Sequence, residues 1–188
     1  AKRDALLDHR HHSIRRRVEF EPAERFEQKQ LSHARRVTEA LCRMLEAETP
    51  YIAPGESIFF WRTVENLPPI LTDAEWARLR ESGFLHEQGR VCNLSPDYGR
   101  VIRRGLGAER AEAERLLAGA QDNEQAEFYC CAIASIDAVL DLCARYQKAA
   151  EDCGSPHAGV LSRVPREGAR TFHEALQSLR ILQYALWC

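Results

Sequence analysis

The chain has 188 residues, of which 45% are hydrophobic and 29% are charged, a composition that predicts one globular domain and excludes a disordered protein. The formal net charge of -2 gives no electrostatic basis for nucleic-acid binding. No apolar run approaches the roughly 20 residues that span a bilayer, so neither a membrane nor a nucleic acid is an expected partner.

The seven cysteines are odd in number, and several lie inside apolar helical patterns. No apolar stretch follows the polar N-terminus, so the sequence shows no signal peptide. We therefore expect a cytoplasmic protein with reduced cysteines that are mostly core residues.

The predicted elements begin after a polar segment, residues 1–21, that is rich in His and Arg. Pro22 predicts the start of a helix that runs to about Glu48, and Ser32 is a candidate N-cap that would split this helix in two. The aromatic run 58–61 that follows predicts at most one short strand pair. The apolar face of the first helix is expected at Phe26, Ala34, Val37, Leu41 and Leu45.

Cap signals predict the remaining helices. Thr72 and Glu75 form a capping box for a short helix that Gly83 stops. Ser95 and Pro96 predict the start of another helix.

The strongest helix is expected over residues 123–152, with Asp122 and Gln125 as its start signal and Gly154 as its end. Its spacing favours a continuous apolar stripe formed by Phe128, Cys131, Ala132, Ser135, Ile136, Val139, Leu142, Cys143 and Tyr146.

A capping box at Thr171 and Glu174 starts the last helix, and its apolar face is expected at Leu176, Leu179, Leu182 and Leu186. The pattern is still apolar at Cys188, with no Gly, Lys or Pro to close it. We therefore expect an all-α domain over residues 22–188 that is truncated at its C-terminal end, with the final helix as its weak point and fraying from about Ile181.

No pattern predicts a catalytic, cofactor-binding or metal-ligating residue. His9, His11 and His12 are interpreted as a solvated run, because no further ligand stands at a suitable spacing. Adjacent Cys130 and Cys131 point about 100° apart on a helix and are interpreted as structural residues. Two further groups are weak signals of a functional site. Arg100, Arg103, Arg104 and Arg110 are interpreted as a solvated helix face. The turn at 105–107 lacks the Lys-Ser/Thr ending of a phosphate-binding loop.

Four stretches carry a resemblance to a known family. Residues 46–58 resemble a "Pro-x-Ile … Gly-Asp/Glu-x-Ile" pattern, and residues 96–106 resemble a "Pro-Asp-Tyr … Gly-Leu" helix start. Residues 126–146 are similar to a long helix with "Glu-Phe-Tyr … Ala-x-Arg-Tyr", and residues 164–177 to "Val-Pro … Thr-Phe-x-Glu-Ala-Leu-Gln". Together they resemble the N-terminal helical part of a pyruvate formate-lyase-like glycyl radical enzyme. After the first stretch, Phe59-Phe60-Trp61 stands where the family often has a glycine.

The resemblance implies that the chain is the helical N-terminal part of a larger α/β-barrel enzyme. Members of this family are lyases of C–C, C–O, C–N or C–S bonds, or acyltransferases such as formate acetyltransferase, of anaerobic metabolism. They carry a thiyl cysteine in a "Gly-Cys-x-Glu" loop and a radical glycine in an "Arg-Val-x-Gly-Tyr" segment. A radical S-adenosylmethionine activating enzyme installs that radical. This sequence has neither motif, because Asn93 replaces the glycine in the run that begins at Arg90.

Three readings follow. The first is the structural portion of such an enzyme, inactive alone and without a cofactor of its own, whose apolar C-terminal helix contacts the remainder of the enzyme or another copy. The second is a non-catalytic helical interaction module descended from such an enzyme. The third is a metal-binding regulator that uses the His and Cys residues.

Overall fold

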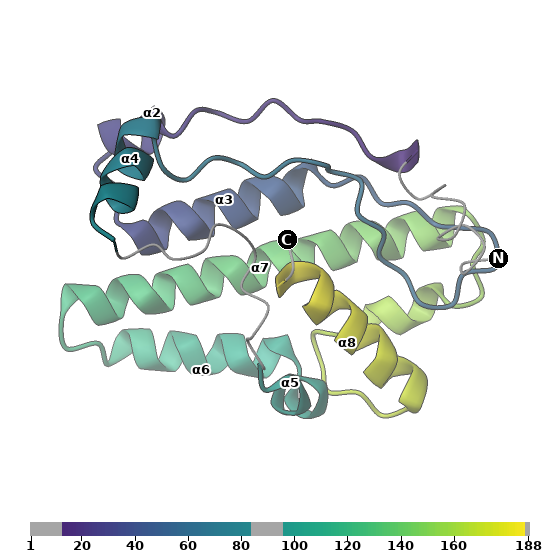
Figure 1. The fold of residues 1–188 in the computed structure, drawn as a ribbon. Coiled ribbons are helices and arrows are strands. Elements are labelled where there is room, and N and C mark those ends of the chain that lie inside the picture. Colours follow the sequence, from purple (N-terminus) through teal and green to yellow (C-terminus); the bar gives the residue numbers. More distant parts are fainter. Residues whose placement is uncertain (1–12, 84–95, 187–188) are drawn as a thin grey trace.

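The computed structural model describes residues 13–83 and 96–186, whose regular elements are helices (Figure 1). In these two ranges the only β-type pairing is a single bridge between Arg16 and Val64, and residues 58–61 form no strand. The helices are α2 (Glu24–Gln28), α3 (His33–Ala47), α4 (Asp73–Glu81), α5 (Tyr98–Arg104), α6 (Leu106–Ala118), α7 (Asn123–Asp152), the 3-10 helix η2 (Ala158–Ser162) and α8 (Phe172–Leu186). None of them combines the length and the apolar character of a membrane span.

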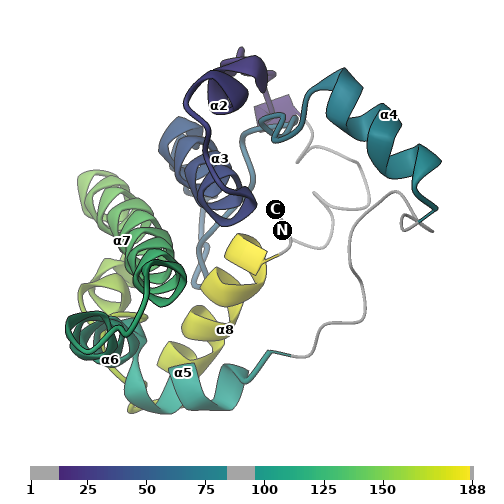
Figure 2. The ribbon, with the colours of Figure 1, turned by 90° about the vertical axis from the view of Figure 1, so that its left-hand side faces the viewer.

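Helices α3, α7 and α6 lie side by side in one layer, with the long α7 in the middle (Figure 1). Helix α8 lies against one face of this layer, and α5 packs beside α8 (Figure 2). The N-terminal segment is attached to the same body, because Val18 and Asn66 exchange two hydrogen bonds of 2.8 Å.

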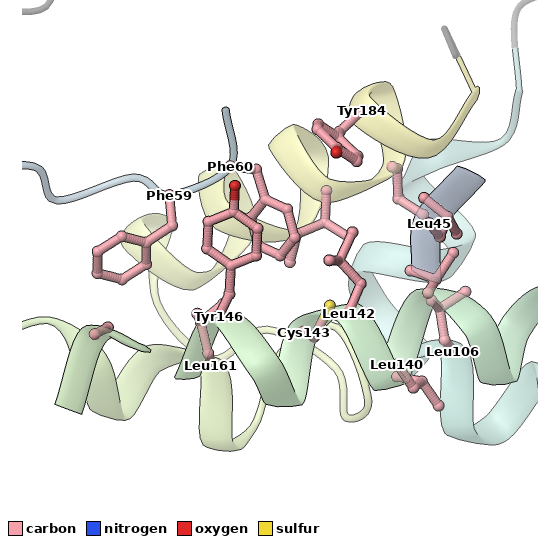
Figure 3. Close-up of a cluster of buried hydrophobic side chains, with 14 of the residues drawn as sticks. Leu45, Phe59, Phe60, Leu106, Leu140, Leu142, Cys143, Tyr146, Leu161 and Tyr184 are labelled. Atoms are coloured by element: carbon pink, nitrogen blue, oxygen red, sulfur yellow. The ribbon is translucent and has the colours of Figure 1, made fainter. Parts of the chain in front are cut away.

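The core lies where the C-terminal half of α7 meets α8 and the buried segment 56–64 (Figure 3). At its centre the Phe60 ring stacks on Tyr146, with ring centroids 4.1 Å apart, and meets Tyr184 edge to face at 5.6 Å. Aromatic pairs of this kind add to the stabilisation that comes from burying the rings. The fully buried core therefore depends on a segment that has no regular secondary structure.

The predicted helix starts are confirmed at four positions. Ser32 accepts a hydrogen bond from the N–H of Arg35, so it does separate α2 from α3. The boxes or caps at 72–75, 122–125 and 171–174 all form, and α7 has the predicted bounds. At α5 the cap is Asp97, which accepts from the N–H of Arg100, and the predicted Ser95 lies outside the described residues.

The predicted face of the first helix is only partly confirmed in α3, where Leu45 is buried and Leu41 packs against the core. Val37 is 45% exposed, whereas Arg36 is buried together with Ala40 and Met44. Arg36 turns inward because its guanidinium pairs with both carboxylate oxygens of Glu75 at 2.9 Å, which ties α3 to α4. The buried side of α3 is thus shared between apolar side chains and one buried ion pair.

The predicted stripe of α7 is buried only in its C-terminal half. Val139, Leu142 and Tyr146 are in the core, but Phe128 is 64% exposed. The expectation of mostly buried cysteines is also wrong for the five described ones: only Cys143 is buried, Cys42 and Cys131 are half-buried, and Cys130 and Cys153 are exposed. All five are free thiols.

Helix α8 buries only part of its predicted face, with Leu182 buried and Leu179 half-buried. Gln177, Ser178 and Ile181 are buried, while Leu176 and Leu186 are exposed. Leu182 is buried within the chain, so fraying from about Ile181 has no support in the packing. Trp187 and Cys188 lie outside the described residues.

Candidate functional site

The most elaborate arrangement of polar groups surrounds residues 56–64, a buried segment that crosses the core without helix or strand. A buried backbone of this kind must find hydrogen-bond partners for its N–H and C=O groups, since each unpaired group costs about 1–3 kcal/mol. Here side chains from α3, α7 and α8 supply those partners. We call Glu48, Tyr146, Gln177 and Arg180 the segment clamp.

Glu48 is the first member of the segment clamp and follows directly after α3. One of its carboxylate oxygens, Oε2, accepts from the N–H groups of Thr63 at 2.7 Å and Val64 at 3.2 Å, and from the Thr63 hydroxyl at 2.5 Å. Arg145 of α7 holds the C-terminal end of α3, because its guanidinium donates to the carbonyls of Leu45 and Glu48, both at 2.5 Å. The Leu45 carbonyl also accepts from the backbone N–H of Glu48 at 3.3 Å, so Arg145 adds a side-chain donor to the backbone cap at the end of α3.

Tyr146 holds the middle of the segment. Its hydroxyl donates to the carbonyl of Trp61 at 2.8 Å and accepts from the N–H of the same residue at 3.1 Å. The indole N–H of Trp61 in turn donates to both carboxylate oxygens of Glu56, at 2.8 and 2.9 Å. Both polar ends of this tryptophan are therefore paired although the residue is buried.

Helix α8 contributes the other two members. Gln177 Oε1 accepts from the N–H of Phe59 at 2.9 Å, and the Arg180 guanidinium donates to the carbonyl of Phe60 at 2.6 and 3.1 Å. The backbone φ of Phe60 is 89°, a left-handed value that is unfavourable for a side chain of this size. Ring packing and the bonds to its carbonyl hold Phe60 in that conformation.

Burial favours the neutral forms of two phenols and one thiol at this core. Desolvation raises the pKa of Tyr146, of Tyr184 and of the Cys143 thiol above their ordinary values. Burial likewise raises the pKa of Cys42, with a further contribution from Glu39. A thiol whose pKa is raised is a poor nucleophile near neutral pH, because the thiolate is the reactive form. The arrangement is suited to positioning a segment.

A cavity of about 410 Å³ lies beside this network, between the turn at 52–56 and the turn at 153–157. His157, at its edge, contacts the ring of His173 edge to face with centroids 5.2 Å apart, and His173 Nε2 lies 2.6 Å from the carbonyl of Ser57. Within residues 13–83 and 96–186, no three His, Cys, Asp or Glu side chains are grouped in a way that could hold a metal ion. His9, His11 and His12 lie outside these ranges, as do Arg90 to Asn93.

The turn at 105–107 has a packing role. The N–H groups of Leu106 and Gly107 donate to the carbonyls of Pro165 and Arg166, at 2.7 and 2.9 Å. A Cβ atom on Gly105 would lie 2.3 Å from the Arg166 carbonyl oxygen, so only glycine fits. The N–H groups that a phosphate would need are therefore occupied by backbone of the same chain.

The basic cluster is a solvated face, as predicted. Arg100 and Arg104 both pair with Glu109, at 2.7 and 3.4 Å, and Arg110 pairs with Asp137 at 2.6 Å.

Cys130 and Cys131 are not bonded to each other.

Sequence reasoning missed the segment clamp. The signal that was available is a polar residue within an otherwise apolar helix, which Gln177 and Arg180 both are. Such a residue is retained inside a core only where it has hydrogen-bond partners. The identity of those partners, 118 and 120 positions away along the chain, has no local signal.

Comparison with solved structures identifies the fold. The glycerol-bound B12-independent glycerol dehydratase from Clostridium butyricum matches 98% of this chain with a TM-score of 0.67 at 19% identity, and the match covers 34% of the dehydratase. A structure from work on 1,2-propanediol dehydration in Roseburia inulinivorans matches 91% of this chain with a TM-score of 0.66 at 18% identity, over 30% of its length. The chain thus spans about a third of either structure. Among curated proteins, none matches the chain.

The sequence model of the pyruvate formate lyase-like family matches residues 69–188, which is 120 of the 188 residues (188 − 69 + 1). Three of the four resembling stretches lie within this match, and the first, residues 46–58, precedes it. The chain therefore belongs to the pyruvate formate lyase-like family of glycyl radical enzymes.

Proposed function

We propose that this chain is the helical, N-terminal structural portion of a glycyl radical enzyme and that it carries neither the thiyl cysteine nor the radical glycine. The observation that supports this most strongly is the mismatch in coverage: nearly all of this chain aligns with a dehydratase, yet it accounts for about a third of that protein. On this proposal the reacting groups belong to the remaining two-thirds.

The use of polar groups in the described residues supports the same proposal. The carboxylate, phenol, amide and guanidinium groups of the segment clamp each form a hydrogen bond with the backbone of residues 59–63. Radical chemistry needs a closed cavity from which water is excluded, and a rigid helical layer can form or support such a wall without holding a reacting group.

The whole enzyme would be a C–C, C–O, C–N or C–S lyase or a formate acetyltransferase-like enzyme of anaerobic metabolism in the cytoplasm. Its radical would be a modified glycine, installed by a radical S-adenosylmethionine activating enzyme, and that enzyme would be a partner of the full-length protein. The two dehydratase-related structures make C–O bond cleavage the first reaction class to test.

Electron paramagnetic resonance decides whether the chain itself carries the radical. The chain is incubated without oxygen with S-adenosylmethionine, a reductant and the activating enzyme, and a family member of full length is treated in parallel. We expect a doublet from the full-length enzyme and none from this chain. A doublet from residues 1–188 would refute the proposal.

A second candidate is a non-catalytic helical interaction module, which the exposed apolar side chains of α8 favour. The reading frame beyond the codon for Cys188 separates the two. A frame that continues into a "Gly-Cys-x-Glu" loop supports the structural portion, and a stop codon at that point supports the module.

A further inference from the structure

Helix α8 is apolar on both sides. Its inward side packs Ile181, Leu182 and Tyr184 into the core. On its outward side Phe172 is 79% exposed, Leu176 is 38% exposed and Leu186 is 52% exposed. Exposed apolar side chains grouped on one side of a helix leave part of the hydrophobic stabilisation unused, and such a group marks a contact surface.

The outward residues have a regular spacing. They follow each other at intervals of four, three, four and three residues along the helix, and all but one are apolar: Phe172, Leu176, Leu179, Gln183 and Leu186. This is the spacing of the seam between two helices that pack at a small crossing angle. We call these five residues the outer seam of α8.

The rotation of α8 is set by two polar residues together with the apolar residues that it buries. Gln177 and Arg180 must face the segment 58–61 to reach the N–H of Phe59 and the carbonyl of Phe60. These bonds fix the rotation of the helix, which places Ile181 in the core and the seam on the side opposite Ile181. The exposure of these leucines therefore follows from the hydrogen bonding and the packing of the core.

The observations favour an occupant other than a second copy. A stable interface between copies takes about 20–30 residues from each partner, and the outer seam offers five side chains. The two charged residues of α8 are both engaged within the chain, Glu174 with Arg163 at 3.3 Å and Arg180 with Phe60, so the seam itself carries no charge pattern for pairing with a copy. The related structures, in contrast, are about three times as long as this chain.

We propose that the outer seam of α8 binds an amphipathic helix from the remaining part of a family-length polypeptide, packed along α8 with apolar side chains between its residues. This inference rests on the proposed function, because it requires that such a remaining part exists. The inference adds a specific contact surface on this chain. It also gives the chemistry of the partner helix, which would present uncharged apolar side chains at the same alternating intervals of four and three residues.

Photo-crosslinking in the full natural polypeptide tests the contact. A benzophenone amino acid replaces Leu176 in one variant and Leu79 of α4 in the other, which is a matched control because the two leucines are 38% and 37% exposed. We expect the probe at 176 to crosslink to one helix outside residues 1–188, and the probe at 79 not to reach that helix. Crosslinks from 176 only within residues 1–188, crosslinks to a second copy, or the same target from both probes would each overturn the inference.

The failure of this inference and that of the proposed function are distinguishable. A reading frame that ends after Cys188 removes the remaining part and refutes both. If the reading frame continues and any of the contrary crosslinking results is found, only the inference about the outer seam is refuted. In the full polypeptide we also expect Leu176→Glu to lower the urea midpoint and Leu79→Glu to leave it unchanged, and equal midpoints for the two variants would overturn the seam.

Discussion

Replacing Tyr146 by phenylalanine tests whether the segment clamp stabilises the fold. The substitution keeps the ring, and therefore the stacking on Phe60, but removes a hydroxyl that serves the N–H and the C=O of Trp61. Both backbone groups are then left without this partner in a fully buried position. At about 1–3 kcal/mol for each of the two groups that lose this partner, we expect Tyr146→Phe to cost about 2–6 kcal/mol of the free energy of unfolding.

The measurement is a urea unfolding curve followed by circular dichroism, with the slope m compared between variants so that a shift in midpoint reports stability. Tyr129→Phe on the same helix is the control, since the structure gives its hydroxyl no hydrogen bond to any described residue and we expect a change below about 0.5 kcal/mol. If Tyr146→Phe were as mild as the control, the hydroxyl would not hold the segment, and the account of the clamp would be wrong.

The same hydroxyl predicts a dependence on alkaline pH. Burial raises the pKa of Tyr146 above its ordinary value of 10.0, so the unfolded chain loses this proton at a lower pH than the folded chain does. Its contribution to stability is therefore complete below pH 10 and is lost as the pH rises above that value, by up to about 1.4 kcal/mol per pH unit. Tyr146→Phe should reduce this slope by one ionising group, and an unchanged slope would contradict the assignment.

Two further predictions concern packing. Cys143→Ser should cost about 1–3 kcal/mol because the thiol is fully buried, whereas Cys130→Ser on the exposed side of the same helix should be close to neutral in the same urea assay. Gly168→Ala should lower the melting temperature strongly, because its Cβ would lie 2.1 Å from the backbone carbonyl oxygen of Arg103, while Gly159→Ala has nothing within 4 Å and should be neutral or slightly stabilising. Equal melting temperatures for the two alanine variants would show that Gly168 is not packed against the backbone of Arg103 at the end of α5.

The sequence by itself determined where α3, α4, α7 and α8 begin and to which family the chain belongs. Caps depend on a few adjacent residues, so Thr72 with Glu75 and Asp122 with Gln125 could be recognised without any knowledge of the tertiary fold. The family rests on short motifs within the long helix α7 and around the start of α8, which are also local features.

Only the tertiary structure decided which face of each helix is buried. Phe128 and Tyr146 are separated by about five turns of α7 and point the same way, yet no described element covers Phe128 while α8 and segment 56–64 cover Tyr146. The apolar periodicity shows which residues share one side of α7, but it does not show how far along the helix another element covers that side.

The positions of buried polar groups were beyond the sequence for the same reason. Gln177 and Arg180 interrupt an apolar pattern, and their partners at 59 and 60 lie more than 115 positions away along the chain. Because a buried polar group is stable only when it is paired, those distant backbone groups, together with the apolar residues that α8 buries, set the rotation of α8 and left its leucine seam outward.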